Sequence, residues 1–177
     1  VQDNRAAAVH IGDGTRLPCE VLVHAGDPRA LASGALGPAV AHIAPITTRA
    51  PRSFSARVLS FAAAPSRDDL VHHNVFFQAD AEAEFRDLMA GRIPAQPSVY
   101  ICALDRGQGV DPPPLERFEI ITNAPALSPD TITTNDPEDL TPWLHQITQQ
   151  MAHFGMTFSP TPTAQTVTTP RAFARLF

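Results

Sequence analysis

The chain has 177 residues, of which 44% are apolar and 18% are charged, a composition ordinary for a globular protein that buries a core without disulfides. Its formal net charge is −5, and its basic residues are all arginines scattered along the sequence. Nucleic acid and anionic lipid both require clustered positive charge, so a general affinity for either is not expected.

The first element expected is a β-hairpin. Residues 5–11 alternate weakly between polar and apolar and run into a Gly-Asp-Gly-Thr turn at 12–15, where glycine supplies the positive φ that such turns need. We expect the return strand over residues 19–24. A helix should follow from Pro28 to about Leu36, because Asp27 can cap it and proline fits its first position.

Four apolar or aromatic runs, separated by polar or proline-rich segments, predict the strands of a sheet. They cover residues 57–64, 71–77, 98–103 and 117–124. These strands are joined as hairpins or meanders with helices inserted. The pattern therefore favours an α+β domain with a mainly antiparallel sheet over a doubly wound parallel fold.

Two helices are expected among these strands. Asp80 can cap the first, whose end is marked by Gly91 and whose buried face should carry Phe85, Leu88 and Met89. The second should run from Pro137 or Glu138 to Phe154, with Asn135 or Asp136 as its cap. Its expected buried face contains Leu140, Trp143, Leu144, Ile147, Met151 and Phe154.

Residues that could carry chemistry are few. Cys19 and Cys102 are interpreted as free thiols, although one bridge between them is conceivable. His72 and His73 are adjacent, and neighbouring strand residues point to opposite faces, so we expect one packed and one exposed imidazole and no metal site. Lining of a substrate cavity is the alternative role for these histidines.

The amino-acid sequence of the N-terminal hairpin resembles a segment found in a known family. Residues from Ala8 to Pro28 are similar to the segment that closes the dinucleotide-binding domain in phytoene-desaturase-like flavoenzymes, which dehydrogenate carotenoids. Glu20 replaces the usual aspartate, and the position usually held by asparagine carries Ala25. No Gly-x-Gly-x-x-Gly phosphate loop occurs in the chain, so we expect it to correspond to the middle third of such an enzyme.

The later strands extend the resemblance to the substrate-binding sheet of the same family. Residues 99–106 and 116–125 look most like the branch that desaturates hydroxyneurosporene or methoxyneurosporene. The resemblance implies two parts: residues 1–44, from the end of the FAD-binding domain, and residues 45–177, an α+β substrate-binding domain. The implied reaction removes a hydride and a proton from adjacent carbons of an acyclic carotenoid, with FAD as the electron acceptor.

The resemblance also implies roles for individual residues. His73, Phe76, Phe77 and Tyr100 would contact a long apolar substrate, with whichever of the two phenylalanines points inward lining its tunnel. Filling of the protein core is the alternative role for these aromatic side chains. Ala25 and Gly26 would lie near FAD in the full-length enzyme, whereas this chain alone should bind no cofactor. No catalytic residue is assigned.

The remaining expectations concern partners and location. The carotenoid is the expected partner, and the isolated chain should self-associate if an apolar sheet face stays uncovered. The sequence lacks a signal peptide and any run of the roughly twenty apolar residues that a membrane span needs, so we expect a cytoplasmic protein. Contact with the periphery of the inner membrane is an expectation for the full-length enzyme only. The alternative function is a non-catalytic α+β binding or interaction module without flavin.

Overall fold

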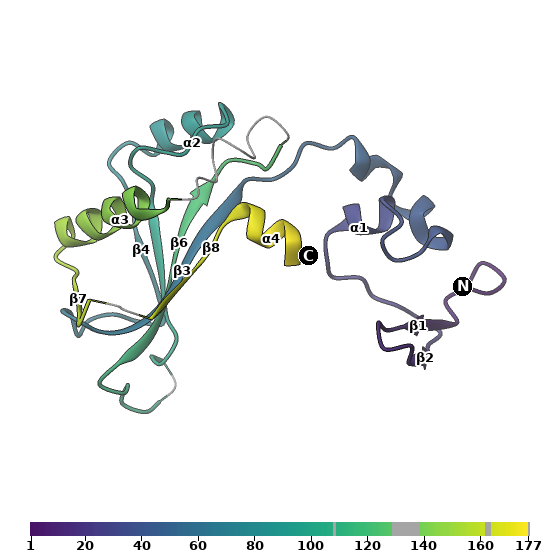
Figure 1. Ribbon diagram of the computed structural model, residues 1–177, viewed down its shortest axis with the longest axis horizontal. Coiled ribbons are helices and arrows are strands. Elements are labelled where there is room, and N and C mark those ends of the chain that lie inside the picture. The colour runs from purple at the N-terminus through teal and green to yellow at the C-terminus, as the bar shows by residue number, and fades with distance from the viewer. Residues whose placement is uncertain (108, 129–138, 162–163, 177) are drawn as a thin grey trace. The chain divides into compact units, whose positions relative to one another are not determined.

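The computed structural model describes residues 1–107, 109–128, 139–161 and 164–176 (Figure 1). Contacts divide the chain into two compact units, Val1–Pro51 and Arg52–Phe177, and each is described by itself. The sequence predicted a boundary after residue 44. Among the described residues, no helix combines the length and the apolar character needed to cross a membrane.

A small hairpin opens the first unit. Strands β1 (Ala8–His10) and β2 (Arg16–Pro18) pair antiparallel, with Val9 opposite Leu17. The Asp13 carboxylate accepts a hydrogen bond of 2.8 Å from the backbone N–H of Thr15, and hydrogen bonding to Thr15 lowers the pKa of that carboxyl. The predicted hairpin is thus confirmed.

The predicted return strand over residues 19–24 is wrong. The backbone N–H of Ile11 donates to the carbonyl of Thr15, so the turn closes at Thr15 and pairing starts at Arg16. Turn geometry fixes the register of a hairpin, and this tight turn uses residues 16–18 as the partner. Val21 and Val23 follow in irregular backbone and are strongly exposed.

Short helices complete the first unit. Helix α1 (Pro28–Ala32) begins with Asp27, whose carboxylate accepts from the N–H of Arg29 at 2.8 Å as predicted. It ends earlier than residue 36 because Gly34 takes a left-handed φ of 77°, which stops the helix. Two 3-10 helices follow, η1 (Pro38–Ile43) and η2 (Pro45–Thr48).

The second unit is built on a six-stranded, entirely antiparallel sheet, which confirms the predicted fold class (Figure 1). The strands run in the order β4-β5-β6-β3, and two short C-terminal strands, β7 and β8, both pair with the far side of β3. Their bounds are β3 (Ser55–Pro65), β4 (His73–Phe76), β5 (Val99–Ala103), β6 (Glu116–Ala124), β7 (Phe158–Ser159) and β8 (Gln165–Thr168). Each of the four predicted strands is present.

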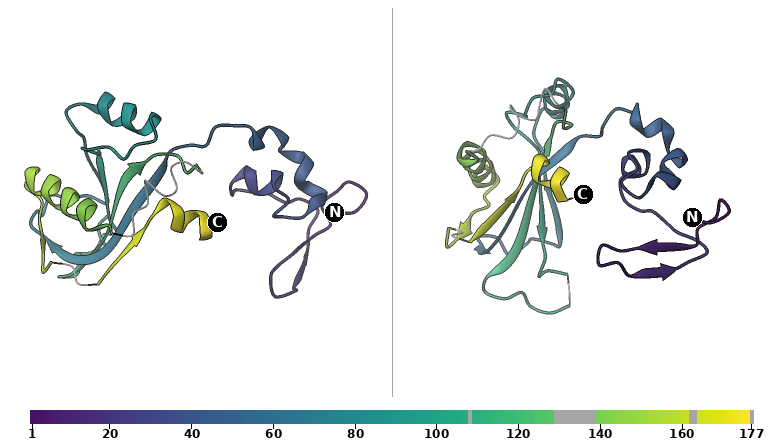
Figure 2. Two further views of the ribbon diagram at one scale, coloured as in Figure 1. Left: turned by 45° about the horizontal axis from the view of Figure 1, so that its top comes forward. Right: turned by 45° about the vertical axis from the view of Figure 1, so that its right-hand side comes forward.

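One face of this sheet carries the core. Alternation along the strands sends every second side chain to the same side. Helix α3 (Thr141–His153) lies over this face (Figure 2). It packs there through Trp143, Ile147 and Met151. The sheet residues beneath it are Leu59, Phe61, Ala63, Val99, Ile101, Ala103, Phe118 and Ile120. The predicted helix and its main buried side chains are therefore confirmed.

The start of α3 differs from the prediction. Asp139 and Leu140 precede the helix, and the Asp139 carboxylate accepts from the N–H of Thr141 at 2.9 Å. Hydrogen bonding to Thr141 also lowers the pKa of Asp139. The predicted caps, Asn135 and Asp136, and the predicted first residues, Pro137 and Glu138, lie outside the described residues.

Helix α2 (Ala81–Met89) is capped by Asp80, which accepts from the N–H of Ala83 at 2.9 Å. The predicted burial of Phe85 and Met89 is wrong, since they are 46% and 71% exposed. Glu84 is buried instead, beside Leu88. Its carboxylate accepts from the backbone N–H and hydroxyl of Ser98 and from the side-chain amide of Asn123. These bonds hold the side of α2 that carries Glu84 against the sheet. Hydrophobic periodicity alone does not predict this orientation of the helix. Helix α4 (Pro170–Leu176) follows β8.

Candidate functional site

The sheet face opposite the core, called the open face here, is the candidate site. In the register, His73 lies opposite Cys102, and Val75 lies opposite Tyr100. On the next strand, Glu119 lies opposite Cys102, and Ile121 opposite Tyr100. Directly paired residues point to the same side of a sheet. The open face therefore carries His73, Val75, Tyr100, Cys102, Glu119 and Ile121, together with Val58 and Ser60 from β3.

Two predicted site residues meet on this face. Nδ1 of His73 lies 2.6 Å from the hydroxyl oxygen of Tyr100, and their rings stack with centroids 6.0 Å apart. Burial raises the pKa of Tyr100, and interactions with Cys102 and Glu119 raise it further. The phenol therefore stays protonated at neutral pH, where it can donate to His73 or to a ligand.

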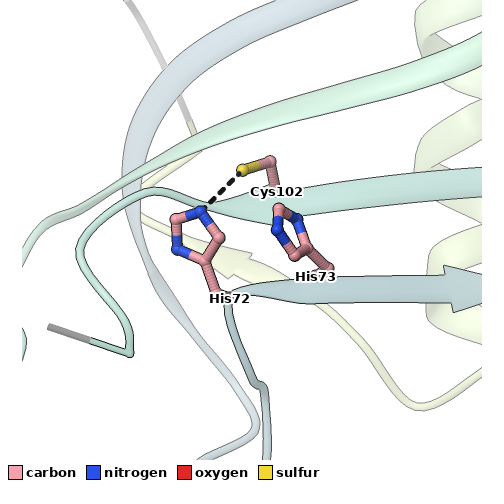
Figure 3. A group of neighbouring side chains, drawn as sticks. All are labelled: His72, His73 and Cys102. Carbon is pink, nitrogen blue, oxygen red and sulfur yellow. Dashed lines mark hydrogen bonds between the residues drawn. The ribbon is translucent and has the colours of Figure 1, made fainter.

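His72 lies beside this pair. As predicted, one imidazole is half-buried and bonded to the backbone and the other is exposed, but the two do not point to opposite faces. His72 immediately precedes β4, so strand alternation does not govern its direction. The rings of His72 and His73 meet edge to face with centroids 4.4 Å apart. Nε2 of His72 lies 3.6 Å from the sulfur of Cys102, so three side chains that can bind a metal converge at one end of the open face (Figure 3).

A salt bridge fixes the loop behind His72. Nδ1 of His72 lies 2.9 Å from the backbone carbonyl of Arg106. The Arg106 guanidinium donates two hydrogen bonds, of 2.6 and 2.8 Å, to the Glu116 carboxylate, and others to the carbonyls of Asp68 and Leu70. The bond to Glu116 raises the pKa of Arg106. The orientation of His72 thus depends on a nearly buried ion pair.

The two phenylalanines predicted to contact the substrate, Phe76 and Phe77, differ in their surroundings. Phe76 packs on the core face, with its ring centroid 5.3 Å from that of Phe154. Phe77 follows the last residue of β4 and is 70% exposed. Only Phe77 of this pair is therefore available to a ligand, alongside His73 and Tyr100 on the open face.

Ala25 and Gly26, predicted to lie near FAD in the full-length enzyme, are in irregular backbone just before α1. A Cβ at Gly26 would lie 2.9 Å from Cε1 of His24, so the close neighbour of this glycine is an imidazole of the same chain. The carboxylate of Asp27 occupies the start of α1. A negative charge there disfavours a diphosphate at the same place. No step of chemistry is assigned to Ala25 or Gly26 on this geometry.

Several residues of the site escaped the sequence-based prediction. Cys102 was assigned only as a thiol, and neither Val75 nor Arg106 was singled out. Spacing could have indicated that Cys102 shares a face with Tyr100, two residues earlier on the same strand. Nothing local indicates that His73 pairs with Cys102, because that pairing depends on the register between two strands.

Comparison with known proteins identifies relatives over the entire chain. It is 42% identical over 176 residues to a hydroxyneurosporene desaturase of Cereibacter sphaeroides and 40% identical over 176 residues to one of Rhodobacter capsulatus. A hydroxyneurosporene desaturase of Rubrivivax gelatinosus is 35% identical over 181 residues. The matches cover 99–100% of this chain but only 34–35% of each relative, so the chain spans about a third of their length. No family model matches the chain. The resemblance predicted from the sequence, including its branch, is confirmed.

Proposed function

We propose that this chain forms the substrate-binding portion of a carotenoid desaturase, because its whole length matches about a third of the length of each hydroxyneurosporene desaturase compared. The observation that carries the proposal is the open face of the sheet. The opposite face is filled by α3 and the core, whereas Val75 on the open face is 48% exposed. A hydroxyneurosporene-type substrate would bind on this side.

The chemistry of the open face suits a long hydrocarbon with a polar end. Val75 and Ile121 supply aliphatic surface, and the ring of Tyr100 lies between β4 and β6. A polyene has few polar groups, so its binding relies on apolar area removed from water, worth about 25 cal/mol per Å². His73 and the Tyr100 hydroxyl could in turn accept from or donate to a substituent at one end of the substrate.

FAD is the cofactor proposed for the complete enzyme, where it would accept the hydride removed from the carotenoid. This chain's residues would position the substrate and keep water away from it. The flavin diphosphate would be held by other parts of the complete enzyme, and the Ala25–Gly26 segment would lie near the flavin.

A chimera tests the proposed function. The homologous third of the Cereibacter sphaeroides desaturase would be replaced by this chain, and desaturation of hydroxyneurosporene would be followed by the shift of its visible absorption. We expect a chimera that contains flavin and desaturates the substrate, because relatedness extends over the whole replaced segment. A chimera with full flavin content and no desaturation would count against a substrate-binding role.

In an active chimera, Val75→Asp should lower turnover at least about tenfold, because it places an unpaired carboxylate against an apolar substrate. The control is Val110→Asp, at a more exposed valine outside the sheet. The control should retain turnover, and both variants should retain flavin. Equal activities in the two variants would show that the open face does not meet the substrate.

The isolated chain should not bind FAD with measurable affinity. The glycine-rich loop that holds a pyrophosphate at a helix N-terminus is absent from the sequence, and Asp27 already caps α1. Equilibrium dialysis of the purified chain against FAD, followed by its visible spectrum, checks this. A stoichiometric flavin spectrum after dialysis would contradict the expectation.

A further inference from the structure

We propose that His72, His73 and Cys102 bind a zinc ion at one end of the open face. Each offers one ligand atom, and the three atoms all lie within 4.8 Å of one another (Figure 3). The cluster joins the start of β4 to β5 through the pairing of His73 with Cys102. The proposal concerns this chain alone and does not depend on its proposed role in a desaturase.

The spacing of the ligand atoms suits tetrahedral zinc. Bonds of about 2.3 Å to sulfur and about 2.05 Å to nitrogen, at a tetrahedral angle, place the two ligand atoms about 3.6 Å apart. Nε2 of His72 and the sulfur of Cys102 are 3.6 Å apart. One nitrogen of His73 lies within 4.8 Å of both of these atoms.

The groups around the cluster orient its imidazoles as zinc ligands require. Donation from Nδ1–H of His72 to the Arg106 carbonyl, 2.9 Å away, leaves the lone pair of Nε2 directed at the sulfur of Cys102. Zinc-bound histidines usually make such a bond through their second nitrogen. The Tyr100 hydroxyl oxygen, 2.6 Å from Nδ1 of His73, can accept from Nδ1–H, which leaves the lone pair of Nε2 for the metal.

Burial and charge favour an ion that enters from the exposed side. Cys102 is buried and His72 is half-buried, whereas His73 is exposed, which leaves the fourth coordination position towards solvent. One thiolate and two neutral imidazoles leave a net positive charge on a bound zinc ion. Glu119, opposite Cys102 on the same face, supplies a nearby negative charge. Two nitrogens and one sulfur favour zinc over magnesium or calcium.

A thiol–imidazole hydrogen bond would also explain the contact between Cys102 and His72, and metal titration separates the two interpretations. The reduced, metal-free 177-residue chain would be titrated with Co²⁺, whose bond to a thiolate gives a charge-transfer absorption band. We expect a band that saturates at one equivalent, disappears on addition of Zn²⁺ and is unaffected by excess Mg²⁺. A chain that gives no such band has only the hydrogen bond.

Variants assign the ligands. Cys102→Ser should abolish the charge-transfer band, and His72→Gln and His73→Gln should each weaken Co²⁺ binding at least about tenfold. Matched controls are Cys19→Ser, which removes the other free thiol, and His145→Gln, on the exposed side of α3; both should bind as the parent chain does.

Circular dichroism would establish that each variant is folded. His73 is exposed, so His73→Gln should fold even if substitution of the buried Cys102 disturbs the packing around β5. A folded His73→Gln variant with unchanged affinity, or a band that requires Cys19 in place of Cys102, would overturn the site.

Discussion

Replacement of Trp143 by alanine should lower the free energy of unfolding by about 3–5 kcal/mol, the range for removing a large aromatic side chain from a packed core. Trp143 is 5% exposed and joins α3 to the sheet. Its indole N–H donates to the hydroxyl of Thr122 at 3.3 Å, and the Arg57 guanidinium lies 5.7 Å from its ring centroid. The variant would lose the packing and leave the buried Thr122 hydroxyl without this donor.

Urea unfolding followed by far-UV circular dichroism measures this loss. Trp143→Phe, which keeps one aromatic ring but removes the N–H and the other ring of the indole, should cost less than the alanine variant. Phe85→Ala, at an exposed aromatic position on α2, should cost less than about 1 kcal/mol. The chain has one tryptophan, so its native emission reports this site alone. A fully solvated emission maximum, or a loss below 1 kcal/mol in Trp143→Ala, would contradict the packing described.

Replacement of Arg106 by methionine should destabilise the protein by about 3–5 kcal/mol, because it leaves a buried carboxylate without its partner. The side chains of Arg106 and Glu116 are only 11% and 4% exposed, and two hydrogen bonds join them. The same guanidinium donates to the carbonyls of Asp68 and Leu70. One substitution thus removes the partners of several groups at once.

Two further variants separate the buried charge from other effects of the Arg106→Met change. Arg106→Met combined with Glu116→Leu should recover much of the lost stability, since an apolar pair can replace a buried ion pair at little cost. The comparison variant is Arg117→Met, which breaks the pair with Asp105; the Arg117 side chain is 67% exposed and that of Asp105 12%, so this loss should be smaller than that of Arg106→Met. If the Arg106→Met and Arg117→Met losses in urea unfolding are equal, the Arg106 pair does not behave as a buried one.

Local features of this chain could be predicted from its sequence because they depend on neighbouring residues. The four strands follow from short apolar runs, and the caps Asp27 and Asp80 act on N–H groups two or three residues away. The antiparallel α+β class follows from the order of these elements. The family resemblance also rests on the amino-acid sequence itself, and the relatives that match the whole chain confirm it.

Tertiary structure decided which side of each element is buried and which distant residues meet. Periodicity assigned Phe85 and Met89 to the core, yet hydrogen bonds from Ser98 and Asn123 draw Glu84 inward instead. Strand alternation predicted that His72 and His73 point to opposite faces. The strand starts only at His73, so alternation does not apply to His72. Such outcomes depend on contacts between residues far apart in the chain.

The candidate site divides in the same way. The sequence indicated His73, Phe77 and Tyr100 through residue type and resemblance. The convergence of His72, His73 and Cys102 required the register of β4 on β5, and the support behind His72 required the Arg106–Glu116 pair. Side-chain type and short spacing are fixed by covalent order, whereas register and ion pairing are set by the packing of the whole sheet.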